Sequence, residues 1–555
     1  MMRHSVGPLL SVNLESSTAT EESIDDTLSS YIGGRGVATK LAHDRIPFDA
    51  DPLGPDNRLV FTTGPLQHAQ MSFTGRMNLT GLSPLTNGLL SSNAGGYLSR
   101  NFTGTGYSAV EINGQADELT AVHISPEGVE FEAVPELAGA EVPEVTAAMQ
   151  ERHGLESEHL ATVGPAGENQ VRFASVMTYD SRAFGRGGLG AALGAKNVKC
   201  ISFRGNATRQ IELPEDPQQE VHRTAATSDD IMRRQGTTGG TEFINDNFSL
   251  PTRYFSEMSF DDAAAIGGDA VEEKKHKKAA CSVCAFACKL PTKDEESGLE
   301  TEGPEFETLM SFGSNPEIGD LVAIMQSNDL CDRYGMDTIS CGNVISAYLD
   351  ATDEFGNVEL VHELIEQIAH RDGVGDTLAD GIGRFHDELD VANWTVKGLD
   401  FAAHDGRVLY GQGLSYAVSN RGADHLYSAT MLSKEYGGAV DPETLDNKAE
   451  ILVTDENRAV IRDSGVICDF AGDRLSEKHH EQLLGASFED LLSVGGRVID
   501  LERHFNNRRG FDRADDQLPY ELPGFEAALD EYYERRGWSA EGVVPDNRIT
   551  ELAET

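Results

Sequence analysis

Three cysteines lie within eight residues near the middle of the chain, in the run Cys281-Ser-Val-Cys284-Ala-Phe-Ala-Cys288. Cysteine thiolates are soft ligands that bind iron–sulfur clusters or zinc. The Cys-x2-Cys-x3-Cys spacing lets one short loop supply three ligands to a compact metal centre, so a fourth ligand must come from elsewhere in the chain. Structural zinc is the alternative, but zinc sites more often pair two Cys-x2-Cys units or add histidine. The spacing therefore favours an iron–sulfur cluster.

A segment rich in glycine and arginine, 181–190, is the second chemical signal. Its residues Gly185, Gly187 and Gly190 match the dinucleotide fingerprint G-x-G-x-x-G. The helix that would follow is too short for a crossover, and the next strand ends in arginine instead of an acid that could bind a ribose. A glycine-rich loop with two arginines still lets a phosphate approach the backbone closely. We therefore expect phosphate binding here, without a nicotinamide-binding fold.

The elements that must position these residues divide the chain into a strand-rich part and a helical part. Short β-like runs such as 58–62 and 171–177 alternate with turn signals over the first 205 residues or so. A polar segment with two prolines, 207–220, is the predicted linker, and the apolar spacing beyond it is helical. We predict an α+β fold with a β-sheet-rich N-terminal domain, 1–208, and two mainly helical domains, 209–400 and 401–555.

The composition limits the partners of the chain. It has 555 residues, a net charge of -47, and 39% hydrophobic residues, so it contains enough apolar material for large cores. So acidic a protein repels nucleic acid and anionic membranes, and we expect neither as a partner. The acids are spread along the whole sequence, which we interpret as a halophilic adaptation to a high-salt cytoplasm, where the Debye length falls to about 3 Å at 1 M salt. No signal peptide or membrane-spanning run is visible, so we expect a cytoplasmic protein.

Several further motifs occur along the chain in a fixed order. They are Tyr31-Ile-Gly-Gly-Arg-Gly-Val-Ala38, Asp51-Pro-Leu-Gly-Pro-Asp-Asn-Arg58, Phe61-Thr-Thr-Gly-Pro65, Gly75-Arg76, Ser83-Pro-Leu-Thr-Asn87, Asn93-Ala-Gly-Gly96, the loop 182–190, the cysteine motif, Gly303-Pro-Glu-Phe-Glu-Thr308 and Ser419-Asn-Arg-Gly-Ala-Asp-His-Leu426. With these motifs the chain resembles the aldehyde ferredoxin oxidoreductase family over nearly its full length. The resemblance implies an enzyme that oxidises aldehydes to carboxylic acids and passes electrons to ferredoxin.

The resemblance also implies the cofactors. Two pterins would hold tungsten, or molybdenum, through their dithiolene sulfurs, so that no side chain need ligate the metal. Cys468 matches the fourth ligand of a 4Fe–4S cluster, beside Cys281, Cys284 and Cys288. Arg76 matches an arginine between the cluster and the pterin. Asn93 and the backbone carbonyl of Ala183 match positions that hold Mg²⁺ between the pterin phosphates. The N-terminal domain would thus be the pterin-binding domain, with further contacts from Gly95, Gly96, Arg182, Gly185, Arg186 and Gly187.

Two Asp-x-x-Gly-Leu-type loops bind the pterins in the family that this chain resembles. The first is Asp332-Arg-Tyr-Gly-Met-Asp337, in which Asp332, Gly335 and Asp337 are the implied contacts. The second is Asp463-Ser-Gly-Val-Ile-Cys468, with Asp463 and Ile467 as contacts. Its glycine is displaced by one position, to residue 465. The spacing of the ligands is kept, but the backbone of this second loop departs from the family pattern.

The catalytic residues are also implied by the resemblance. Glu305 and His425 match residues that the family places beside the metal, and Glu307 is the nearby alternative to Glu305. A carboxylate there can take a proton from water that attacks an aldehyde, and a histidine can orient the substrate oxygen. His404 stands where relatives often carry tyrosine. Because histidine titrates near neutrality, the exchange either alters substrate preference or is a harmless change in a pocket wall.

The expected partners are a small aldehyde and ferredoxin, and a homodimer is an assembly that the sequence leaves open. The basic run Lys274-Lys-His-Lys-Lys278 precedes the cysteine motif and could dock an acidic ferredoxin; the alternative is a solvated turn that offsets neighbouring glutamates. Two other functions also stay open. One is a member of the family that acts on a different substrate or as a reductase. The other is a non-catalytic protein with a structural metal at the cysteines.

Overall fold

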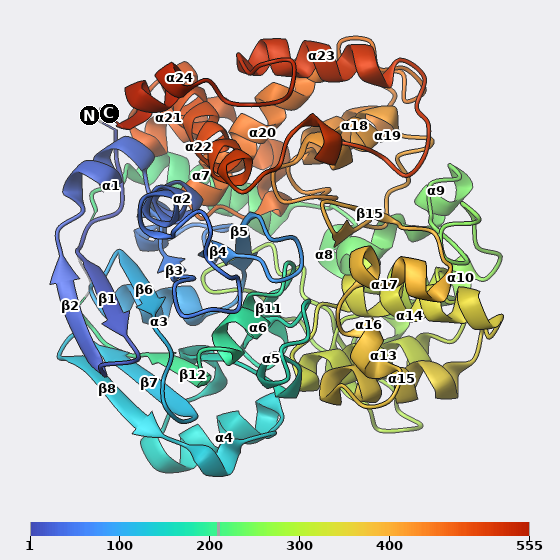
Figure 1. Cartoon of the computed structure of the whole chain (residues 1–555), viewed down its shortest axis with the longest axis horizontal. Helices are drawn as coiled ribbons and strands as arrows, with labels where there is room; N and C mark the ends of the chain where they lie inside the picture. The colour runs from blue at the N-terminus through green and yellow to red at the C-terminus, as the bar shows by residue number, and fades with distance from the viewer. Residues whose placement is uncertain (1, 208–210, 554–555) are drawn as a thin grey trace.

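A six-stranded mixed sheet begins the chain. The structure is a computed structural model that describes residues 2–207 and 211–553. The strand order is β2-β1-β6-β3-β4-β5, in which β1 and β6 pair in parallel and the other neighbours pair antiparallel. The strands are β1 (Leu9–Asn13), β2 (Thr18–Glu22), β3 (Leu59–Thr62), β4 (Met77–Leu82), β5 (Leu89–Ala94) and β6 (Ala109–Asn113). Figure 1 shows this sheet in blue on the left of the molecule.

A second six-stranded sheet packs on the first. Its order is β11-β10-β9-β12-β7-β8, and β7 and β12 pair in parallel. The strands are β7 (Thr120–Ser125), β8 (Gly128–Ala133), β9 (Leu160–Thr162), β10 (Val176–Thr178), β11 (Arg182–Phe184) and β12 (Val198–Phe203). The ring of Phe61 on the first sheet lies 5.7 Å from the rings of Phe184 and Phe203 on the second. All three are fully buried, so aromatic packing joins the two sheets into one core.

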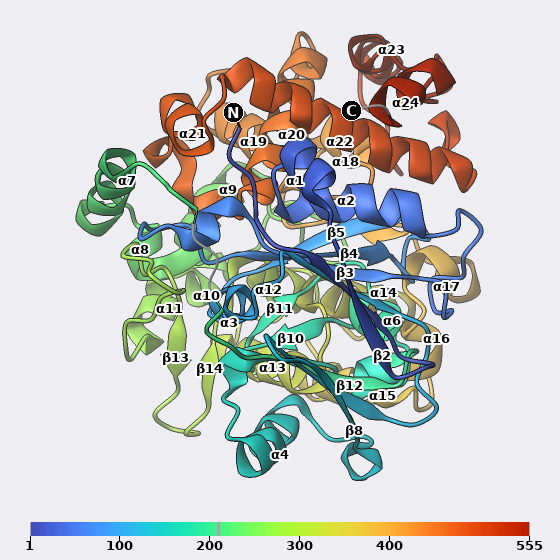
Figure 2. The same cartoon turned by 90° about the vertical axis from the view of Figure 1, so that its left-hand side faces the viewer.

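Short helices connect and cover these strands. They are α1 (Asp25–Tyr31), α2 (Gly34–Arg45), α3 (Leu98–Gly104), α4 (Val142–His153), α5 (Pro165–Glu168) and α6 (Leu189–Gly194). Helix α4 begins with a capping box between Glu141 and Glu144 and ends at Gly154, which adopts the left-handed conformation that favours glycine. Figure 2 shows α4 at one end of the molecule and the late helices, shown in orange and red, at the other.

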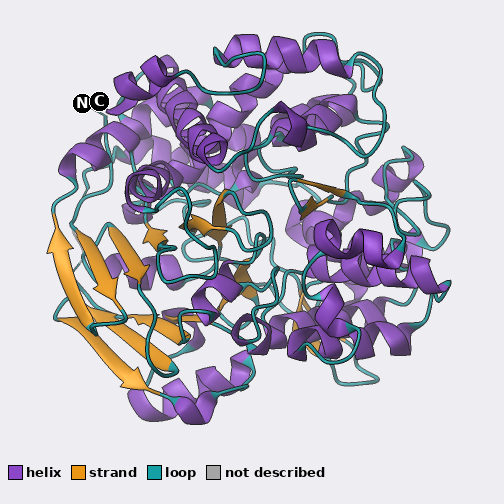
Figure 3. Ribbon diagram, viewed as in Figure 1, coloured by secondary structure: helices purple, strands orange, loops and turns teal. Residues whose placement is uncertain are grey.

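The chain after residue 211 is mainly helical, as Figure 3 shows. Its helices are α7 (Glu215–Thr227), α8 (Met232–Gln235), α9 (Thr241–Asp246), α10 (Ala263–Ile266), α11 (Gly268–Lys274), α12 (Phe306–Leu309), α13 (Leu321–Tyr334), α14 (Thr338–Thr352), α15 (Val358–His370), α16 (Gly375–Leu378), α17 (Ile382–Leu389), α18 (Tyr410–Val418), α19 (Ala429–Tyr436), α20 (Lys448–Ser464), α21 (Glu477–Leu484), α22 (Phe488–Arg508), α23 (Phe525–Arg536) and α24 (Asp546–Ala553). Two small hairpins, β13 (Pro291–Lys293) with β14 (Glu300–Glu302) and β15 (Thr395–Val396) with β16 (Leu399–Asp400), complete the fold.

The predicted α+β fold, with a sheet-rich first part and a mainly helical remainder, is confirmed. One local prediction is wrong: helix α7 begins at Glu215, inside the segment predicted as a linker. The turn of this helix that follows Pro214 buries Pro217 and Val221, so the prolines mark a helix start instead of an extended connection. None of the helices in the described ranges is long and apolar enough to cross a membrane.

Helix α2 ties the N-terminal part to the late helices. The guanidinium of Arg35 is fully buried, and its Nη2 lies 2.7 Å from Glu502 Oε2 on α22. Its Nη1 lies 3.4 Å from Asp463 Oδ2 on α20. A buried charge that lost such a partner would cost about 3–5 kcal/mol, so this ion pair holds the end of α20 against the sheet region.

Candidate functional site

The four predicted cluster ligands line one cavity of about 220 Å³, which we call the cysteine cavity. Cys281, Cys284 and Cys288 come from the loop before β13, and Cys468 follows α20. The loop backbone is left-handed at Val283 and Ala287, with φ of 61° and 53°. Such conformations cost roughly 1–3 kcal/mol each and persist only where the surroundings fix them. The structure thus brings together four cysteines that the sequence places far apart.

Glycines let the first sheet approach these cysteines. A Cβ atom on Gly75 would lie 3.2 Å from Cys281 Cβ, and one on Gly95 would lie 3.3 Å from Cys281 Sγ. Both distances are short for side-chain carbon, so glycine at each position keeps the strand ends close to the cysteine loop. Gly96, the next predicted contact, adopts φ of 114° and accepts a hydrogen bond from the Ser282 amide at 3.0 Å. The Asn93-to-Gly96 motif therefore forms part of the wall or support of the cysteine cavity.

Arg76 is one of three basic residues that line this cavity, together with Arg182 and Lys289. Its Nη2 donates to Cys468 Sγ at 3.6 Å. Burial opposes the charge of the guanidinium, but Cys468 and Asp469 outweigh burial and raise the pKa of Arg76. Its Nε atom is buried with no hydrogen-bond partner among the described residues. Arg76 thus has one donor on the sulfur of Cys468 and another that has no partner among the described residues.

A second cavity, of about 120 Å³, shares Arg76 and Asn93 with the first, and we call it the histidine cavity. Its wall contains five of the other predicted residues, namely Gly185, Arg186, His425, Asp463 and Ile467. Arg421 also lines it, held by Ser91 O at 2.9 Å and by an ion pair with Asp424. The Nε of Arg421 has no partner among the described residues. Unpartnered buried donors of this kind fit an anionic group such as a phosphate.

The glycine-rich loop 182–190 contributes unequally to the two cavities. Arg182 and Ala183 line the cysteine cavity from β11, and a Cβ on Gly185 would meet nothing within 4 Å. Gly187 is different, because a Cβ there would lie 2.2 Å from Leu90 Cδ1. Gly187 is not among the described residues that line either cavity. Its glycine is explained by close packing and a φ of 92°.

The first predicted pterin loop ends α13 and begins α14. Gly335 adopts φ of 76° as the last turn unwinds, and Asp337 caps α14 by accepting hydrogen bonds from Ile339 N and Ser340 N. Arg186 Nε donates to Asp337 Oδ2 at 3.3 Å. Burial raises the pKa of the Asp332 carboxyl well above its ordinary value, and Asn328 donates to that carboxyl at 3.1 Å. The described residues that line the two cavities do not include Asp332, Gly335 or Asp337.

The second predicted pterin loop adopts a related turn with a different residue. Gly465 keeps a right-handed backbone, with φ of -78°, whereas Val466 takes the left-handed conformation at φ of 57°. Val466 therefore occupies the conformation that Gly335 supplies in the first loop. Glycines of the N-terminal motifs press against this loop, because a Cβ on Gly34 would lie 2.1 Å from Asp463 O and one on Gly64 would lie 2.6 Å from Ser464 O.

The two candidate catalytic glutamates face different neighbours. Glu305 precedes α12 and lines the cysteine cavity; its Oε1 lies 3.4 Å from Arg182 Nη1, and its Oε2 accepts from Thr237 Oγ1 at 2.6 Å. Glu307 Oε1 instead lies 3.3 Å from His425 Nε2. Glu305 has an extended backbone just before α12, whereas Glu307 lies in the first turn of the helix, so one motif directs two carboxylates to different sides. The structure does not pair the predicted residues Glu305 and His425; it pairs His425 with Glu307.

Comparison with known proteins identifies the family. Residues 9–205 match the family described as "Aldehyde ferredoxin oxidoreductase, N-terminal domain". Residues 212–553 match "Aldehyde ferredoxin oxidoreductase, domains 2 & 3". The chain belongs to the aldehyde ferredoxin oxidoreductase family. This is a family of oxidoreductase enzymes, which confirms the resemblance found in the sequence.

Similar members of the family include the "Tungsten-containing aldehyde ferredoxin oxidoreductase" of Pyrococcus furiosus, which is 32% identical over 98% of both chains. The protein of the same name from Thermococcus kodakarensis is also 32% identical over 98% of both. An "Aliphatic sulfonate oxidoreductase, WOR-like subunit" of Pyrococcus furiosus is 27% identical and covers 98% of this chain and 96% of its own. A solved structure, "Active site complex BamBC of Benzoyl Coenzyme A reductase in complex with 1,5 Dienoyl-CoA", shares the fold with a TM-score of 0.84 at 21% identity, covering 100% of this chain and 97% of its own.

His404 lies next to Glu307 in this member of the aldehyde ferredoxin oxidoreductase family. Its Nε2 lies 3.9 Å from Glu307 Oε1, and its Nδ1 lies 3.1 Å from the hydroxyl of Tyr436. That hydroxyl in turn lies 2.9 Å from Ser249 Oγ. Burial, with a smaller effect of His425, lowers the pKa of His404 well below its ordinary value. The sequence showed that histidine replaces the tyrosine common in relatives at position 404. Only the structure shows that this histidine lies between Glu307 and Tyr436.

The basic run before the cysteines is only partly available to a partner of this family member. Lys274 pairs with Asp294 at 2.8 Å, and Lys275 donates to the carbonyls of Arg233 and Arg234 at 3.3 and 3.0 Å. Lys277 and Lys278 are exposed. Half of the predicted docking patch therefore serves local structure, and the other half faces solvent close to the cysteine loop.

Proposed function

We propose that this chain is a tungsten-containing oxidoreductase that converts aldehydes to carboxylic acids and passes the electrons through a 4Fe–4S cluster to ferredoxin. The observation that carries this proposal is the pair of adjoining cavities, which share Arg76 and Asn93. One collects four cysteines and the other contains His425. The tungsten-containing relatives named above support the metal and the substrate class.

The residues present fit these cofactors. Buried donors without partners among the described residues, Arg76 Nε, Arg182 Nε, Arg421 Nε and Lys289 Nζ, can bind anionic groups. We propose that the four cysteines hold the iron cluster, and that Asn93 and the carbonyl of Ala183 hold Mg²⁺. The pterin contacts would be Arg76, Asn93, Gly95, Gly96, Arg182, Ala183, Gly185, Arg186, Gly187, Asp332, Gly335, Asp337, Asp463 and Ile467. When bound, the tungsten–pterin group accepts the two electrons of the oxidation.

The protein's own part of the reaction is to move protons and orient the substrate. Oxidation of an aldehyde by water yields a carboxylic acid, two protons and two electrons. In the proposal Glu307 takes the proton of the attacking water, since its carboxylate is the one that faces His425 at 3.3 Å. His425 Nδ1 is buried without a partner among the described residues, so it can bind the substrate oxygen. His404 then relays a proton between Glu307 and the hydroxyl of Tyr436.

Glu305 takes a different role in this proposal from the one that the motif implied. Its carboxylate lies between Arg182 and the Thr237 hydroxyl on the wall of the cysteine cavity. Arg182 is further held by an ion pair with Glu302. Two carboxylates on one guanidinium fix its direction and keep it charged, because their charges outweigh burial and raise its pKa. Glu305 is therefore a positioning residue for Arg182.

Electron transfer requires a partner close to the cluster ligands. We propose that ferredoxin docks over the cysteine loop, where Lys277 and Lys278 are exposed together with Val283, an apolar side chain that is 37% exposed. Opposite charges steer such encounters, and salt weakens them. The double exchange of Lys277 and Lys278 to glutamate is expected to slow reduction of ferredoxin but not of a small neutral dye. Equal rates with ferredoxin at moderate salt would contradict this docking surface.

Metal analysis tests the central proposal. The purified protein is expected to contain tungsten and about four irons per chain, as a single 4Fe–4S cluster requires. Cys468→Ser should lose iron and the electron transfer to a viologen acceptor, while Cys341→Ser, at a buried cysteine outside both cavities, should retain both. Zinc at the cysteines with no tungsten would overturn the proposal and support a structural metal site. A screen of aldehydes and sulfonates with the same acceptor identifies the substrate class.

A further inference from the structure

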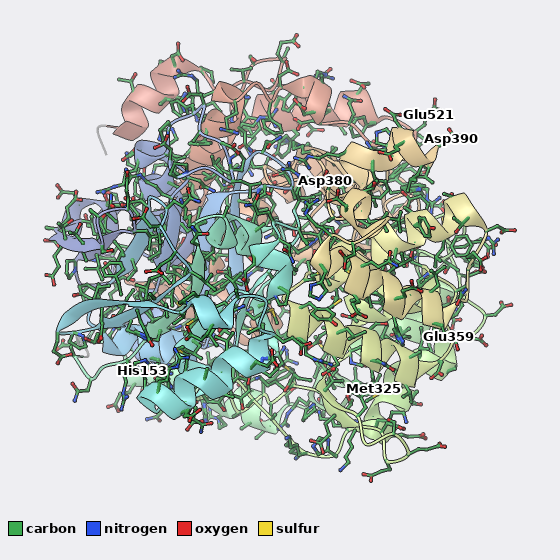
Figure 4. All side chains as sticks on the ribbon, turned by 60° about the horizontal axis from the view of Figure 1, so that its bottom comes forward. His153, Met325, Glu359, Asp380, Asp390 and Glu521 are labelled. Carbon is green, nitrogen blue, oxygen red and sulfur yellow. The ribbon has the colours of Figure 1, made fainter. Side chains whose placement is uncertain are left out.

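A second group of metal-ligand side chains lies on the second sheet, outside both cavities. His123 is on β7, Glu132 is on the neighbouring strand β8, and His153 is the last residue of α4. Figure 4 labels His153 beside α4 at the edge of the molecule. Imidazole nitrogen and carboxylate oxygen are donors that suit zinc and the neighbouring transition metals. No step of the proposed oxidation uses these three residues.

The donor atoms of the three side chains converge. His123 Nε2 lies 3.1 Å and His153 Nε2 lies 2.7 Å from the same oxygen, Glu132 Oε2. The two rings are 4.6 Å apart between centroids, and all three donor atoms fall within 4.8 Å of one another. Bonds of about 2.0–2.2 Å to a tetrahedral ion place its donors roughly 3.3–3.5 Å apart. The three atoms are thus already spaced to within small side-chain movements of a metal site.

The strands supply a fixed outer support for this arrangement. Ser202 on β12 stands opposite His123 in the parallel register, and its hydroxyl lies 2.8 Å from His123 Nδ1. A partner on one ring nitrogen orients a histidine and leaves the other nitrogen for a metal, as the outer hydrogen bonds of zinc sites do. On the other side, Arg204 Nη1 donates to the carbonyl of His153 at 3.2 Å and holds the end of α4 in place.

The charges around the group favour a cation. Arg152 Nη1 binds Glu132 Oε1 at 3.1 Å, so the oxygen that faces the two histidines is the other one. The charge of Arg152 is itself countered by Glu136, at 2.5 Å. Glu130 stands directly opposite His123 in the β7–β8 register and, with Glu127 and Arg204, lines a hollow of about 360 Å³ beside the histidines. Around Glu132, three further carboxylates therefore outnumber two arginines.

We propose that His123, Glu132 and His153 bind a divalent transition-metal ion such as Zn²⁺, with water from the adjoining hollow in the fourth position. The ion joins the paired strands β7 and β8 to the end of α4, which follows β8 through a loop. An ion that binds the folded state alone stabilises it in proportion to the logarithm of its concentration. The site is thus a metal clip at the edge of the second sheet, and it serves stability.

Metal binding to the intact holoenzyme tests the clip. After EDTA dialysis, wild-type enzyme titrated with Zn²⁺ should bind one equivalent beyond the ions of its cofactors, and its melting temperature should rise by several degrees. His153→Ala removes an exposed ligand and is therefore expected to fold. It should lose that equivalent and the shift in melting temperature, with aldehyde oxidation unchanged. The matched control is His370→Ala, an exposed histidine with no part in the group or in the proposed docking surface, which should behave as wild type.

Glu132→Gln separates a metal clip from a simple hydrogen-bonded cluster. The amide keeps the shape and the hydrogen bonds but is a poor zinc ligand. The metal clip predicts that this variant loses the Zn²⁺-dependent rise in melting temperature. If the wild type shows no rise, or if His153→Ala and Glu132→Gln bind Zn²⁺ as the wild type does, the three residues form only a hydrogen-bonded cluster and the proposal is wrong.

Discussion

The cysteine cavity and the histidine cavity share Arg76 and Asn93, yet their side chains are held very differently. In the cysteine cavity the charged groups are fastened, with Arg182 on two glutamates and Arg76 on Cys468. On the histidine side Arg421 is fastened to Asp424 in the same way, but the two histidines have no such partner: His425 and His404 lie 3.3 and 3.9 Å from one oxygen of Glu307. Neither the His425 Nδ1 nor that oxygen has a hydrogen-bond partner among the described residues.

In the proposed function this difference lets one motif, at the start of α12, serve two tasks. A group that passes electrons needs fixed surroundings, because fixed charges hold its potential constant. A group that binds a substrate needs polar atoms that are not already satisfied, since these recognise the substrate and shift protons as it reacts. Glu305 and Glu307 are two residues apart and belong to one side each. The comparison of the two cavities can therefore be tested by asking which of these two carboxylates the reaction needs.

Exchange of Glu307 to glutamine is the strongest way to break this comparison. The amide keeps the shape but cannot take a proton, so we expect kcat for aldehyde oxidation to fall by about 10²–10⁴-fold, the usual contribution of a general base. Glu305→Gln is the matched control at the same motif, and we expect a loss of about tenfold or less because Arg182 keeps Glu302. The measurement is steady-state oxidation with a viologen acceptor, at equal tungsten content.

The opposite order of these two effects would contradict the assignment. If Glu305→Gln lost more activity than Glu307→Gln while both retained iron and tungsten, the motif-based choice of Glu305 would be correct and the 3.3 Å contact of Glu307 with His425 would be structural. A second readout for Glu305→Gln is the spectrum or the potential of the cluster. If Glu305 positions Arg182, the variant should alter one of them and change KM only little.

The sequence predicted which cysteines lie together better than it predicted the directions of the other side chains. Cysteine spacing and the family resemblance selected four cysteines, and the fold brings all four to one cavity. They could not distinguish Glu305 from Glu307, since the direction of a side chain depends on where α12 begins. Nor could they show that Val466 adopts the conformation expected of a glycine, because packing of Gly34 and Gly64 against the loop sets that turn. The sequence also could not show that Lys274 and Lys275 bind neighbouring groups, because those partners are brought close only by the fold.

Exchange of His404 to phenylalanine sharpens the comparison, because it removes one titratable group from the histidine side. Burial holds the pKa of His404 well below its ordinary value of about 6.5, so the unfolded chain takes up the proton first as pH falls. The contribution of neutral His404 to stability is complete above pH 6.5 and is lost as pH falls from there toward its folded pKa. This loss amounts to up to about 1.4 kcal/mol per pH unit.

His404→Phe should therefore lose less stability than the wild type between pH 6.5 and 5, measured as the free energy of unfolding or the melting temperature. His276→Phe, at an exposed position, should follow the wild-type curve. Parallel curves for His404→Phe and wild type would mean that His404 is protonated as easily in the folded protein as in the unfolded chain. In that case the neutral relay between Glu307 and Tyr436 would lose its basis.

The smallest effect that we predict separates the two loops behind the cavities. Gly335 has φ of 76°, and a Cβ there would lie 3.1 Å from Gly164 N, so Gly335→Ala should lower the free energy of unfolding by about 1–2 kcal/mol. Gly465→Ala should be close to neutral: its φ of -78° suits alanine, and the nearest atom to a new Cβ, at 3.2 Å, is the flexible end of Ile467. Denaturant unfolding of both variants measures the difference. Equal losses would mean that the second loop needs its glycine as much as the first, so that the displaced glycine, and not Val466, defines the turn next to Cys468.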